Sequence, residues 1–591
     1  MEPEVDVTLM NQPAQPRIFL SYRLAYGALT LAIIGFGFYA QHLNSQLYQK
    51  HAPFYDSITY YDRVYEVASI RNQTGLLAAV QNACLEKSTI VMPYLMAIPF
   101  SYFFSPTRAI GVWIEIAYFA TFLFSVGYLL HRVFGARPRE VLFMLVPFFL
   151  LSALYRPYAG ISDLRVDLPM AFLYGASACW LFIGMLHHRW RDLFIAGLLM
   201  AAACLSRAIA PVYFGIGMAP LVVHELIRSE QKFEVLKRAI FVGGIVALFS
   251  GWFYLAHYDF LYYYYFVWNT DANASVSFGR SLRHILLVAK SVGPFVAVFF
   301  LSLYMTNKSI SRSEMAECKT EALEWDRPNL PVSPYLWFCW IGVAPVLVLI
   351  VKRADLNPFV SLPSATVLLM LWTLIQHRAF QWVIDRRLPR ILWTSSICLT
   401  LAMTYGYVNH TITKLDNSAA AHRVVLNEML RDAEKTDLQG ATFSVNVMTV
   451  LNTGSLQSTL RFEKTSSYAG PQTTSLNNRE WIADDRFFLP AEVNWRELPG
   501  DSNKEKIDGL LDHAISEVDY IVSPTLESVP AIQAKYDYCF ASRFAGDIIS
   551  SFEDSPSWRP ITEKVEIQDG IAVVVLKNFD PARRSRQRSG R

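Results

Sequence analysis

Long apolar runs separated by short polar segments fill roughly the first 410 residues of the chain. A helix needs about 17–25 apolar residues to cross a bilayer, and backbone groups in lipid must pair within the segment. Each run therefore predicts a membrane-spanning helix. The expected spans are 24–43, 109–130, 141–158, 168–186, 193–206, 208–227, 239–255, 285–304, 335–351, 359–376 and 391–407.

A further apolar piece, 90–104, is short for a crossing and contains Pro93 and Pro99. It predicts a re-entrant or interfacial helix. Leaving it out of the count places most loop arginines and lysines on the cytoplasmic side, as the positive-inside rule requires. We therefore expect a polytopic α-helical membrane protein of about 11–13 helices, with eleven preferred and an even count left open. With eleven spans the C-terminus lies outside.

The pattern changes after residue 409, where no run is long enough to span and polar residues dominate. Short alternating stretches at 441–447 and 519–522 predict strands, and 564–576 predicts a hairpin that turns at Asp569-Gly570. Residues 505–515 predict a helix. The expected organisation is a cytoplasmic N-terminus (1–23), a transmembrane module (24–408) with an outer loop (44–107), an extracytoplasmic soluble α/β domain (409–582) and a basic disordered tail (583–591).

Composition supports a membrane protein, because 53% of the residues are hydrophobic and only 17% are charged, against about a quarter charged in soluble domains. The net charge of +3 gives no reason to expect a nucleic-acid partner. The cysteines have no metal-ligand spacing, so no metal site is expected. Cys84 and Cys539 both fall on the predicted outer side, and whether they pair is left open. The acidic N-terminus has no cleavage site after its first apolar run, which predicts an uncleaved anchor.

Tyr55 and Asp56 follow directly after the first predicted span, at the water–lipid boundary. Residues 57–70 have helical spacing, so Asp56 can cap that helix. The alternative is that Asp56 is a general base facing a cavity above the membrane. Asp62 lies on a different helical face and is a possible second acid. Arg63 can pair with Glu66 as ordinary surface charges.

A second group of charges, Asp163, Arg165 and Asp167, precedes and opens the span at 168–186. Asp167 can simply start that helix. Charges at a membrane boundary are costly unless they are paired or useful, so Arg165 can pair with a carboxylate or hold a phosphate. Asp163 and Asp167 are possible second acids, and Arg207 is a possible phosphate contact between the fifth and sixth spans.

Cations also end the ninth span on the predicted outer side, at Lys352 and Arg353. They are either interfacial anchors or a cradle for a lipid phosphate. Glu115 and Lys290 lie at similar depth inside two spans and predict a structural ion pair. The aromatic stretch after His257 and Asp259 suits the membrane interface, and its rings could equally pack on a sugar or a prenyl chain in a substrate cavity.

The order of these features resembles the GT-C superfamily of membrane glycosyltransferases, especially bacterial relatives of protein O-mannosyltransferases and lipid A aminoarabinose transferases. The resemblance rests on Asp56 after the first span, the Pro-containing helix, His131-Arg132-Val133-Phe134-Gly135, Arg165-x-Asp167, Ala196-Gly197-Leu198-Leu199 leading to Ser206-Arg207, Asn357-Pro358-x-x-x-Leu362-Pro363 and the soluble C-terminal domain.

The resemblance implies that Asp56 is the catalytic acid of the first outer loop and that a polyprenyl-phosphate sugar is the donor. Two departures matter. No Asp-Glu or Asp-x-Asp doublet follows Asp56, so a divalent metal is not supported and no cofactor is assigned. The Lys-Pro-Pro often found before the second apolar helix is replaced by Lys87-Ser-Thr-Ile-Val-Met-Pro93, which leaves Lys87 as a candidate phosphate contact.

The resulting expectation is an inverting sugar transferase at the extracytoplasmic face of a bacterial inner membrane. The acceptor is a hydroxyl of a lipid, glycan or protein, and cations such as Arg165, Lys352 and Arg353 would stabilise the departing phosphate. The alternative class is a membrane transporter or lipid flippase, which usually has midplane polar sites and inverted halves. A degenerate family member acting as a scaffold is a third possibility.

Overall fold

The computed structural model describes residues 16–50, 55–85, 88–104, 108–156, 160–262, 334–352, 362–383, 418–436, 442–444, 520–535, 545–553, 555–568 and 570–579, with short pieces at 285–293 and 397–409. The predicted spans 285–304 and 391–407, the helix 505–515 and the tail 583–591 lie wholly or largely outside these residues. Contacts divide the chain into two units, 1–42 with 63–411 and 43–62 with 412–591, and each unit is described by itself.

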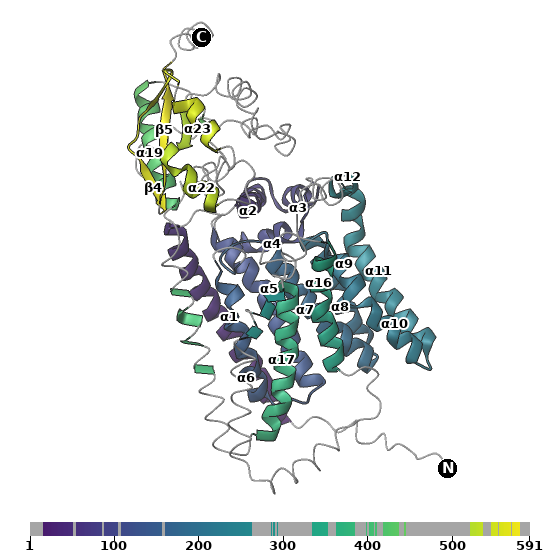
Figure 1. The fold of residues 1–591 in the computed structure, drawn as a ribbon. Helices are drawn as coiled ribbons and strands as arrows, with labels where there is room; N and C mark the ends of the chain where they lie inside the picture. The colour runs from purple at the N-terminus through teal and green to yellow at the C-terminus, as the bar shows by residue number, and fades with distance from the viewer. Residues whose placement is uncertain are drawn as a thin grey trace, which may run out of the picture. The chain divides into compact units, whose positions relative to one another are not determined.

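The first unit is helical (Figure 1). Within the described residues, five helical segments are long and apolar enough to cross a membrane: Tyr22–Leu47, Arg108–Arg132, Asp167–His187, Ala210–Arg228 and Lys232–Ala256. The helices that lie in this unit or enter it are α1 (Pro16–Lys50), α2 (Tyr55–Thr74), α3 (Leu76–Leu85), α4 (Met92–Phe100), α5 (Arg108–Arg132), α6 (Pro138–Phe149), α7 (Asp167–His187), α8 (Trp190–Ser206), α9 (Ala210–Gly217), α10 (Ala219–Arg228), α11 (Lys232–Ala256), α12 (Tyr258–Tyr262), α16 (Pro334–Lys352) and α17 (Leu362–Val383).

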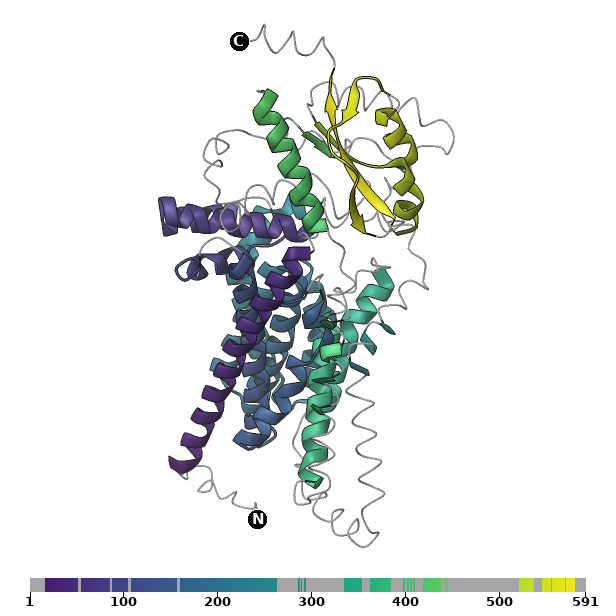
Figure 2. The ribbon, with the colours of Figure 1, turned by 90° about the vertical axis from the view of Figure 1, so that its left-hand side faces the viewer.

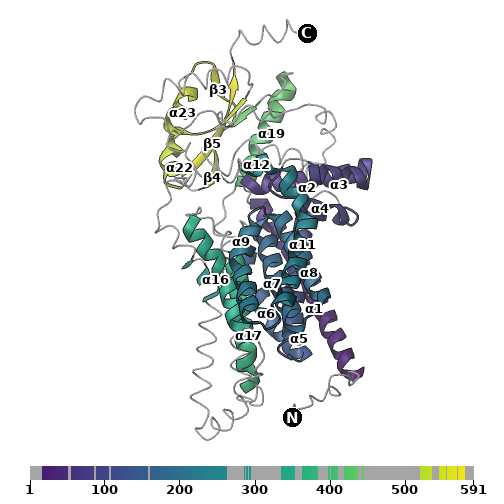
Figure 3. The same ribbon diagram turned by 90° about the vertical axis from the view of Figure 1, so that its right-hand side faces the viewer.

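Helix α7 lies in the middle of this bundle, as Figures 1 and 3 both show. It packs mainly against α5, α8 and α17, and 94% of its most apolar stretch is buried. A helix that is apolar on all sides is stable only where neighbours or lipid cover every side. The surrounding helices therefore restrict the movement of α7. Charged groups at its first residues are fixed in position as a result.

Two predicted spans differ from the structure. Residues 141–158 were expected to form one helix, but α6 ends at Phe149 and a single 3-10 turn, η2 (Ser152–Tyr155), follows. Pro147 lies in the last turn of α6 and has no backbone amide with which to continue the helical hydrogen bonds. The expectation of a continuous crossing there was wrong.

The predicted span 208–227 is divided into α9 and α10 at Met218. Pro220 in the first turn of α10 cannot donate to the preceding turn. Gly217 is required at the break, because a Cβ there would lie 2.2 Å from the Tyr174 hydroxyl oxygen. Tyr174 in turn donates a hydrogen bond of 3.1 Å to the Ile341 carbonyl on α16. The interruption between α9 and α10 therefore packs against Tyr174 of α7, which is itself bonded to α16.

The apolar piece 90–104 forms only the nine-residue α4, about 14 Å long at 1.5 Å per residue. That length cannot cross a bilayer, which agrees with the predicted re-entrant or interfacial role. Helix α4 packs on α3, α5 and α8. The Val91 amide before it donates to the Leu205 carbonyl at 2.7 Å, so α4 is attached to the end of α8.

The second unit contains a five-stranded sheet with the order β1-β2-β5-β3, and β4 pairs with the other end of β5. The strands are β1 (Thr442–Ser444), β2 (Tyr520–Pro524), β3 (Trp558–Pro560), β4 (Val565–Gln568) and β5 (Ile571–Asn578). Helix α19 (Ser418–Thr436) lies on one side of the sheet, and α22 (Val529–Lys535) and α23 (Ala545–Glu553) lie on the other (Figure 2).

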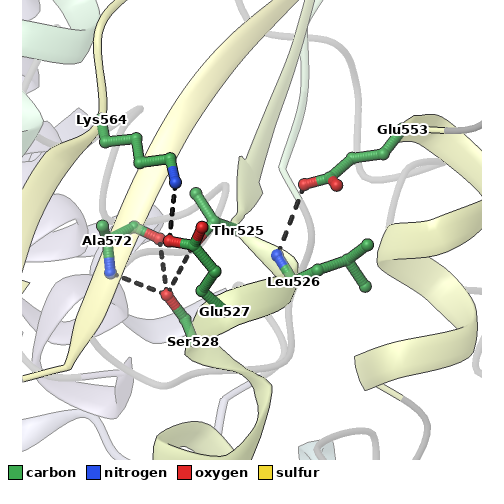
Figure 4. A network of polar contacts seen from close by, with 7 residues as sticks. All are labelled: Thr525, Leu526, Glu527, Ser528, Glu553, Lys564 and Ala572. Atoms are coloured by element: carbon green, nitrogen blue, oxygen red, sulfur yellow. Dashed lines mark hydrogen bonds and ion pairs between the residues drawn. The ribbon is translucent and has the colours of Figure 1, made fainter.

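The predicted strands at 441–447 and 519–522 and the predicted hairpin are confirmed as β1, β2 and β4–β5. Gly570 in the hairpin turn has φ +73°, which glycine adopts without strain. A short polar network supports the sheet from one end (Figure 4). The Ser528 hydroxyl accepts from the Ala572 amide at 2.9 Å and bonds with the Thr525 hydroxyl at 2.8 Å.

Candidate functional site

Buried charges gather at one end of the helical bundle, which we call the upper end. There α5 and α7 begin and α8 and α11 end, as the chain direction in Figure 1 shows. It is the end that the sequence predicts to be extracytoplasmic. The charged residues come from three places: Glu115 on α5, Asp163 and Arg165 in the loop before α7, and the pair of Asp167 and Arg207.

The loop that carries Asp163 and Arg165 is held by its own backbone. The Ile161 amide donates to the Leu154 carbonyl at 2.8 Å, and the Asp163 amide donates to the Gly160 carbonyl at 3.0 Å. Only glycine fits at position 160, because a Cβ would lie 2.2 Å from the Arg156 carbonyl oxygen. This tight turn directs the charged residues of the loop back into the bundle.

Asp163 and Arg165 form a buried ion pair, with 3.9 Å between a carboxylate oxygen and the guanidinium Nε. Their side chains are 7% and 3% exposed, respectively. Of the two roles left open for Arg165, pairing with a carboxylate is therefore realised. Arg165 is thus almost inaccessible to water, and the charged group contains one cation that is more exposed.

That more exposed cation is Arg207, whose side chain is 22% exposed and forms an ion pair with Asp167. Arg207 ends α8 in an extended backbone conformation, and Asp167 begins α7. Asp167 lies in the first turn of α7, and the N-cap position before it is Val166, which makes no side-chain capping hydrogen bond. The start of α7 at this residue matches the sequence prediction, and its carboxylate faces another helix. A guanidinium has five N–H donors, so Arg207 can bind Asp167 and still contact a second anion.

Glu115 completes the group from α5 and is fully buried. Its carboxyl group lies near the Asp163 carboxylate and the Arg165 backbone amide. The Tyr118 hydroxyl, one turn further along α5, lies near Glu115 and Ser206. The predicted partner of Glu115, Lys290, lies outside the described residues. Nothing in the spacing of the residues indicated that α5 would face the loop before α7.

Two aromatic side chains near the end of α11, Tyr254 and His257, form hydrogen bonds with the end of α8 and the end of α3. The Tyr254 hydroxyl donates to the Ala208 carbonyl at 3.1 Å and lies 3.4 Å from that of Cys204. His257, which is 3% exposed, contacts the Cys84 carbonyl through Nε2 at 3.1 Å. His257 therefore joins the end of α3 to the end of α11, a role that sequence spacing did not indicate.

An apolar groove of about 530 Å³ runs between α7, α8, α9, α10 and α11. On α11 its lining extends from Ala239 to Tyr254, about 22 Å at 1.5 Å per residue. Cys204, Pro211 and Tyr254 line the groove near the charged group in sequence or by contact. Three glycines also line it: Gly215, Gly243 and Gly251. A Cβ at any of these glycines would have no neighbour within 4 Å. The lining thus includes Cys204 and Pro211, three residues before and four residues after Arg207 in the sequence, and there is open space beside its glycines.

Several predicted site residues cannot be assessed from their side chains. Asp56 lies in the first turn of α2 and Tyr55 begins that helix, Asp62 lies further along it, and Lys352 ends α16, but their side chains are not described. Lys87 and Arg353 lie outside the described residues, as does Cys539. Asp259 is exposed in the first turn of α12, and Cys84 is a free thiol.

The predicted helix 57–70 is confirmed as part of α2, and Val64 and Tyr65 are buried on its apolar face as expected. The predicted pair of Arg63 and Glu66 is also confirmed, at 2.7 Å. Arg63 is not a surface charge, however, since it is 7% exposed and also donates to the Asn82 carbonyl at 2.7 Å. It fixes α2 to α3. Among the described residues, no three His, Cys, Asp or Glu side chains are grouped to hold a metal ion.

No protein-family model matches the sequence, and no curated protein matches it. Solved structures do match the fold. The apo crystal structure of ArnT from Cupriavidus metallidurans aligns with a TM-score of 0.54 at 12% identity, over 93% of this chain and 98% of that one. The structure of the same protein bound to undecaprenyl phosphate aligns with a TM-score of 0.54 at 11% identity, with the same coverage. The chain is therefore a polytopic membrane protein with a GT-C-like fold and a small C-terminal sheet region.

Proposed function

We propose that this protein transfers a sugar from a polyprenyl-phosphate donor to an acceptor hydroxyl at the extracytoplasmic face of the membrane. The observations that carry the proposal are the partly exposed Arg207, which pairs with Asp167, and the apolar groove, whose lining includes Cys204 and Pro211 on either side of Arg207 in the sequence. A polyprenyl phosphate combines an anionic head with a long apolar chain. The fold similarity to ArnT, one of whose structures has undecaprenyl phosphate bound, supports the same ligand class.

The groove would hold the prenyl chain, and Arg207 would contact the phosphate. The walls are almost wholly apolar, so burial of a hydrocarbon chain against them is favourable by about 25 cal/mol per Å². Charge-assisted hydrogen bonds from a guanidinium to phosphate are short and strong. Asp167 and Asp163 would keep Arg207 and Arg165 oriented while the head group binds.

In the proposed reaction, the acceptor oxygen attacks the anomeric carbon of the sugar as the bond from that carbon to the phosphate oxygen breaks. Asp56 takes the proton of the acceptor hydroxyl as general base. The bonding electrons leave with the polyprenyl phosphate, which needs no proton, and the anomeric configuration inverts. Arg207 would stabilise the charge that develops on the phosphate, with Lys87, Lys352 and Arg353 as further candidate contacts.

Mass spectrometry of envelope lipids and glycans tests this proposal in a deletion strain complemented with wild type or Asp56→Asn. We expect one sugar modification to disappear on deletion, to return with the wild type and to stay absent with Asp56→Asn. Glu234→Gln, an exposed residue paired with Lys237 near the start of α11, controls for expression and membrane insertion.

Two results would overturn the proposal. The first is an unchanged set of envelope glycans and lipids in the deletion strain. The second is counterflow of a labelled solute by purified protein in proteoliposomes with no covalent product, which would assign the chain to the transporters.

A further inference from the structure

Arg238 is a buried cation near the end of the bundle where α7 ends and α8 and α11 begin, opposite to the charged group. It is 7% exposed and shares one face of α11 with Val235, Val242 and Ile245, each 7% exposed or less. This face packs on α8, where a Cβ at Gly197 would lie 2.9 Å from Ile245 (Figure 3). A guanidinium on such a face needs a counter-charge, because burying an unpaired charge is costly.

No carboxylate forms an ion pair with Arg238 within the described part of the chain. Its hydrogen-bonding contact there joins Nη1 to Nδ1 of His188, and its Nε is buried without a partner. Guanidinium nitrogens only donate, so the imidazole accepts through Nδ1 and is neutral. His188 is itself fixed as the C-cap of α7, where its amide donates to the Gly184 carbonyl. His188 therefore orients Arg238 without balancing its charge.

Two carboxylates occur in the first turns of α8 and α11, and neither neutralises Arg238. Glu234 pairs with Lys237 at 2.7 Å, and both side chains are more than a third exposed. Asp192 is 2% exposed, and one of its carboxylate oxygens is buried without a hydrogen bond. A carboxylate in the first turn of a helix is stabilised by the helix dipole, so Asp192 does not require Arg238. The described residues around Arg238 thus leave room for one anion.

The surroundings of Arg238 match the boundary of a membrane. Arg238 lies six residues into α11, about 9 Å along a helix that is long and apolar enough to span a bilayer. Phe233 and Ile240 on the same helix are 67% and 65% exposed. Trp190, which begins α8 and is 45% exposed, packs edge-on against Phe241. Tryptophan is typical of the membrane interface, where lipid phosphates lie, whereas a soluble anion would have to leave bulk water to reach this depth.

We propose that Arg238 binds the phosphate of an anionic phospholipid in the leaflet at this end, which the sequence predicts to be cytoplasmic. Nε and Nη2 would donate to two phosphate oxygens, the bidentate arrangement that suits a guanidinium, while Nη1 stays with His188. Arg189 and Arg191 are exposed nearby in the sequence and add positive potential. The acyl chains would lie along the exposed apolar residues of α11. None of this rests on the proposed sugar transfer.

Melting temperatures of the full-length protein in nanodiscs of phosphatidylcholine, with and without phosphatidylglycerol, test the site. Phosphatidylglycerol should raise the melting temperature of wild type by a few degrees, and Arg238→Gln should show no such increase. In phosphatidylcholine alone, Arg238→Gln should melt at or above the wild-type temperature, because it lacks the unpaired buried charge. Lys237→Gln, at the neighbouring exposed position, is the matched control and should keep the increase.

Native mass spectrometry of protein taken from mixed lipid gives a second readout. Wild type should retain phosphatidylglycerol over phosphatidylcholine with a preference about tenfold greater than that of Arg238→Gln, as expected for one charge-assisted contact. Inorganic phosphate added to phosphatidylcholine nanodiscs separates the lipid from a soluble anion, and it should not reproduce the increase in melting temperature.

Three results would overturn the proposal. The first is a wild type that shows no preference for phosphatidylglycerol, or the same preference as Arg238→Gln. The second is a lower melting temperature of Arg238→Gln in phosphatidylcholine alone, which would show that Asp192 or another carboxylate of the chain pairs with Arg238. The third is full stabilisation by inorganic phosphate, which would assign the site to a soluble anion. These measurements need no sugar substrate, so they stand if the proposed function fails.

Discussion

Arg207 at the end of α8 forms an ion pair with Asp167 at the start of α7, across 40 positions of sequence. The two helices form an antiparallel hairpin, and their ends meet again at the upper end of the bundle. Asp167 is 6% exposed in its side chain, against 22% for Arg207. The pair therefore presents its positive member outward, which suits it to an anionic ligand.

A double-mutant cycle on this pair should show strong coupling. Asp167→Asn leaves Arg207 without its counter-charge, and Arg207→Gln leaves a nearly buried carboxylate unpaired, which costs about 3 kcal/mol. The double variant should lose clearly less stability than the sum of the two single variants, with a coupling energy of about 1–3 kcal/mol. Thermal unfolding in detergent measures the stability. The exposed pair of Lys237 and Glu234 is the matched control, where coupling should stay below about 0.5 kcal/mol.

Arg207→Gln should also weaken the binding of undecaprenyl phosphate by about tenfold or more, since a charge-assisted hydrogen bond contributes roughly 1.5–3 kcal/mol. Binding to protein in nanodiscs, titrated with the lipid phosphate and with the uncharged polyprenol, separates the head group from the chain. Equal affinity of wild type and Arg207→Gln for the phosphate would remove Arg207 from the proposed site.

A large side chain introduced on α11 should fill the apolar groove at Gly243 but leave it open at the neighbouring Gly244. Gly243 lines the groove and Gly244 does not, and a Cβ at either would meet nothing within 4 Å. Leucine at either position should favour the α11 helix by a similar amount, about 0.5–1 kcal/mol. Only Gly243→Leu should reduce the affinity for a long polyprenyl phosphate. Binding titrations with long and short prenyl chains check this, and equal affinity of both variants for the long chain would exclude the groove as its site.

His188 follows α7 at the end of the bundle opposite to the charged group. Its imidazole ring should make the stability of the folded protein depend on pH. Burial, followed by the neighbouring Arg238 guanidinium and His187, lowers the pKa of His188, and its ring contacts Arg238. Below the ordinary histidine pKa of about 6.5, the unfolded chain binds more protons than the folded one at this site. Stability should therefore fall as the pH drops below about 6.5.

His188→Asn should reduce this acid sensitivity. His188 has φ 55°, a left-handed conformation that asparagine tolerates better than most residues. Melting temperatures between about pH 5 and pH 7.5 measure the effect. His224→Asn on α10 controls for the loss of one histidine, and an unchanged pH slope in His188→Asn would contradict the assignment.

The sheet domain depends on one buried lysine. Lys577 on β5 is 4% exposed and donates to the Asp432 carboxylate on α19 at 2.5 Å, and the Tyr520 hydroxyl on β2 donates to the same oxygen at 2.7 Å. Asp432→Ala leaves the lysine unpaired, so the domain should lose about 3 kcal/mol. Hydrogen exchange of β5 in the full chain measures the loss.

Lys564→Gln is the control for that variant. Lys564 pairs with Glu527 at 2.6 Å in the network of Figure 4, but both side chains are more than half exposed. Exposed pairs contribute at most about 1 kcal/mol. Similar protection of β5 in Asp432→Ala and Lys564→Gln would show that the α19 contact does not stabilise the sheet.

Local patterns in the sequence determined the elements. Apolar length was enough to predict the crossings that became α1, α5, α7 and α11, and alternation with an Asp-Gly turn was enough for β4 and β5. Both signals act within a few residues along the chain. They failed at 141–158, where proline removes one hydrogen bond and the helix ends at Phe149. The predicted crossing at 208–227 is present as Ala210–Arg228, with an interruption at Met218 that the pattern did not predict.

The sequence by itself determined that this is a polytopic helical membrane protein with charged residues at one end of its helices and a separate α/β sheet. Only the tertiary structure decided which charges meet. Spacing did not pair Arg207 with Asp167 or bring Glu115 to Asp163, because those contacts depend on how helices distant in sequence pack side by side. Helix packing is set by the fit of many apolar side chains together, and no short stretch of sequence contains that information.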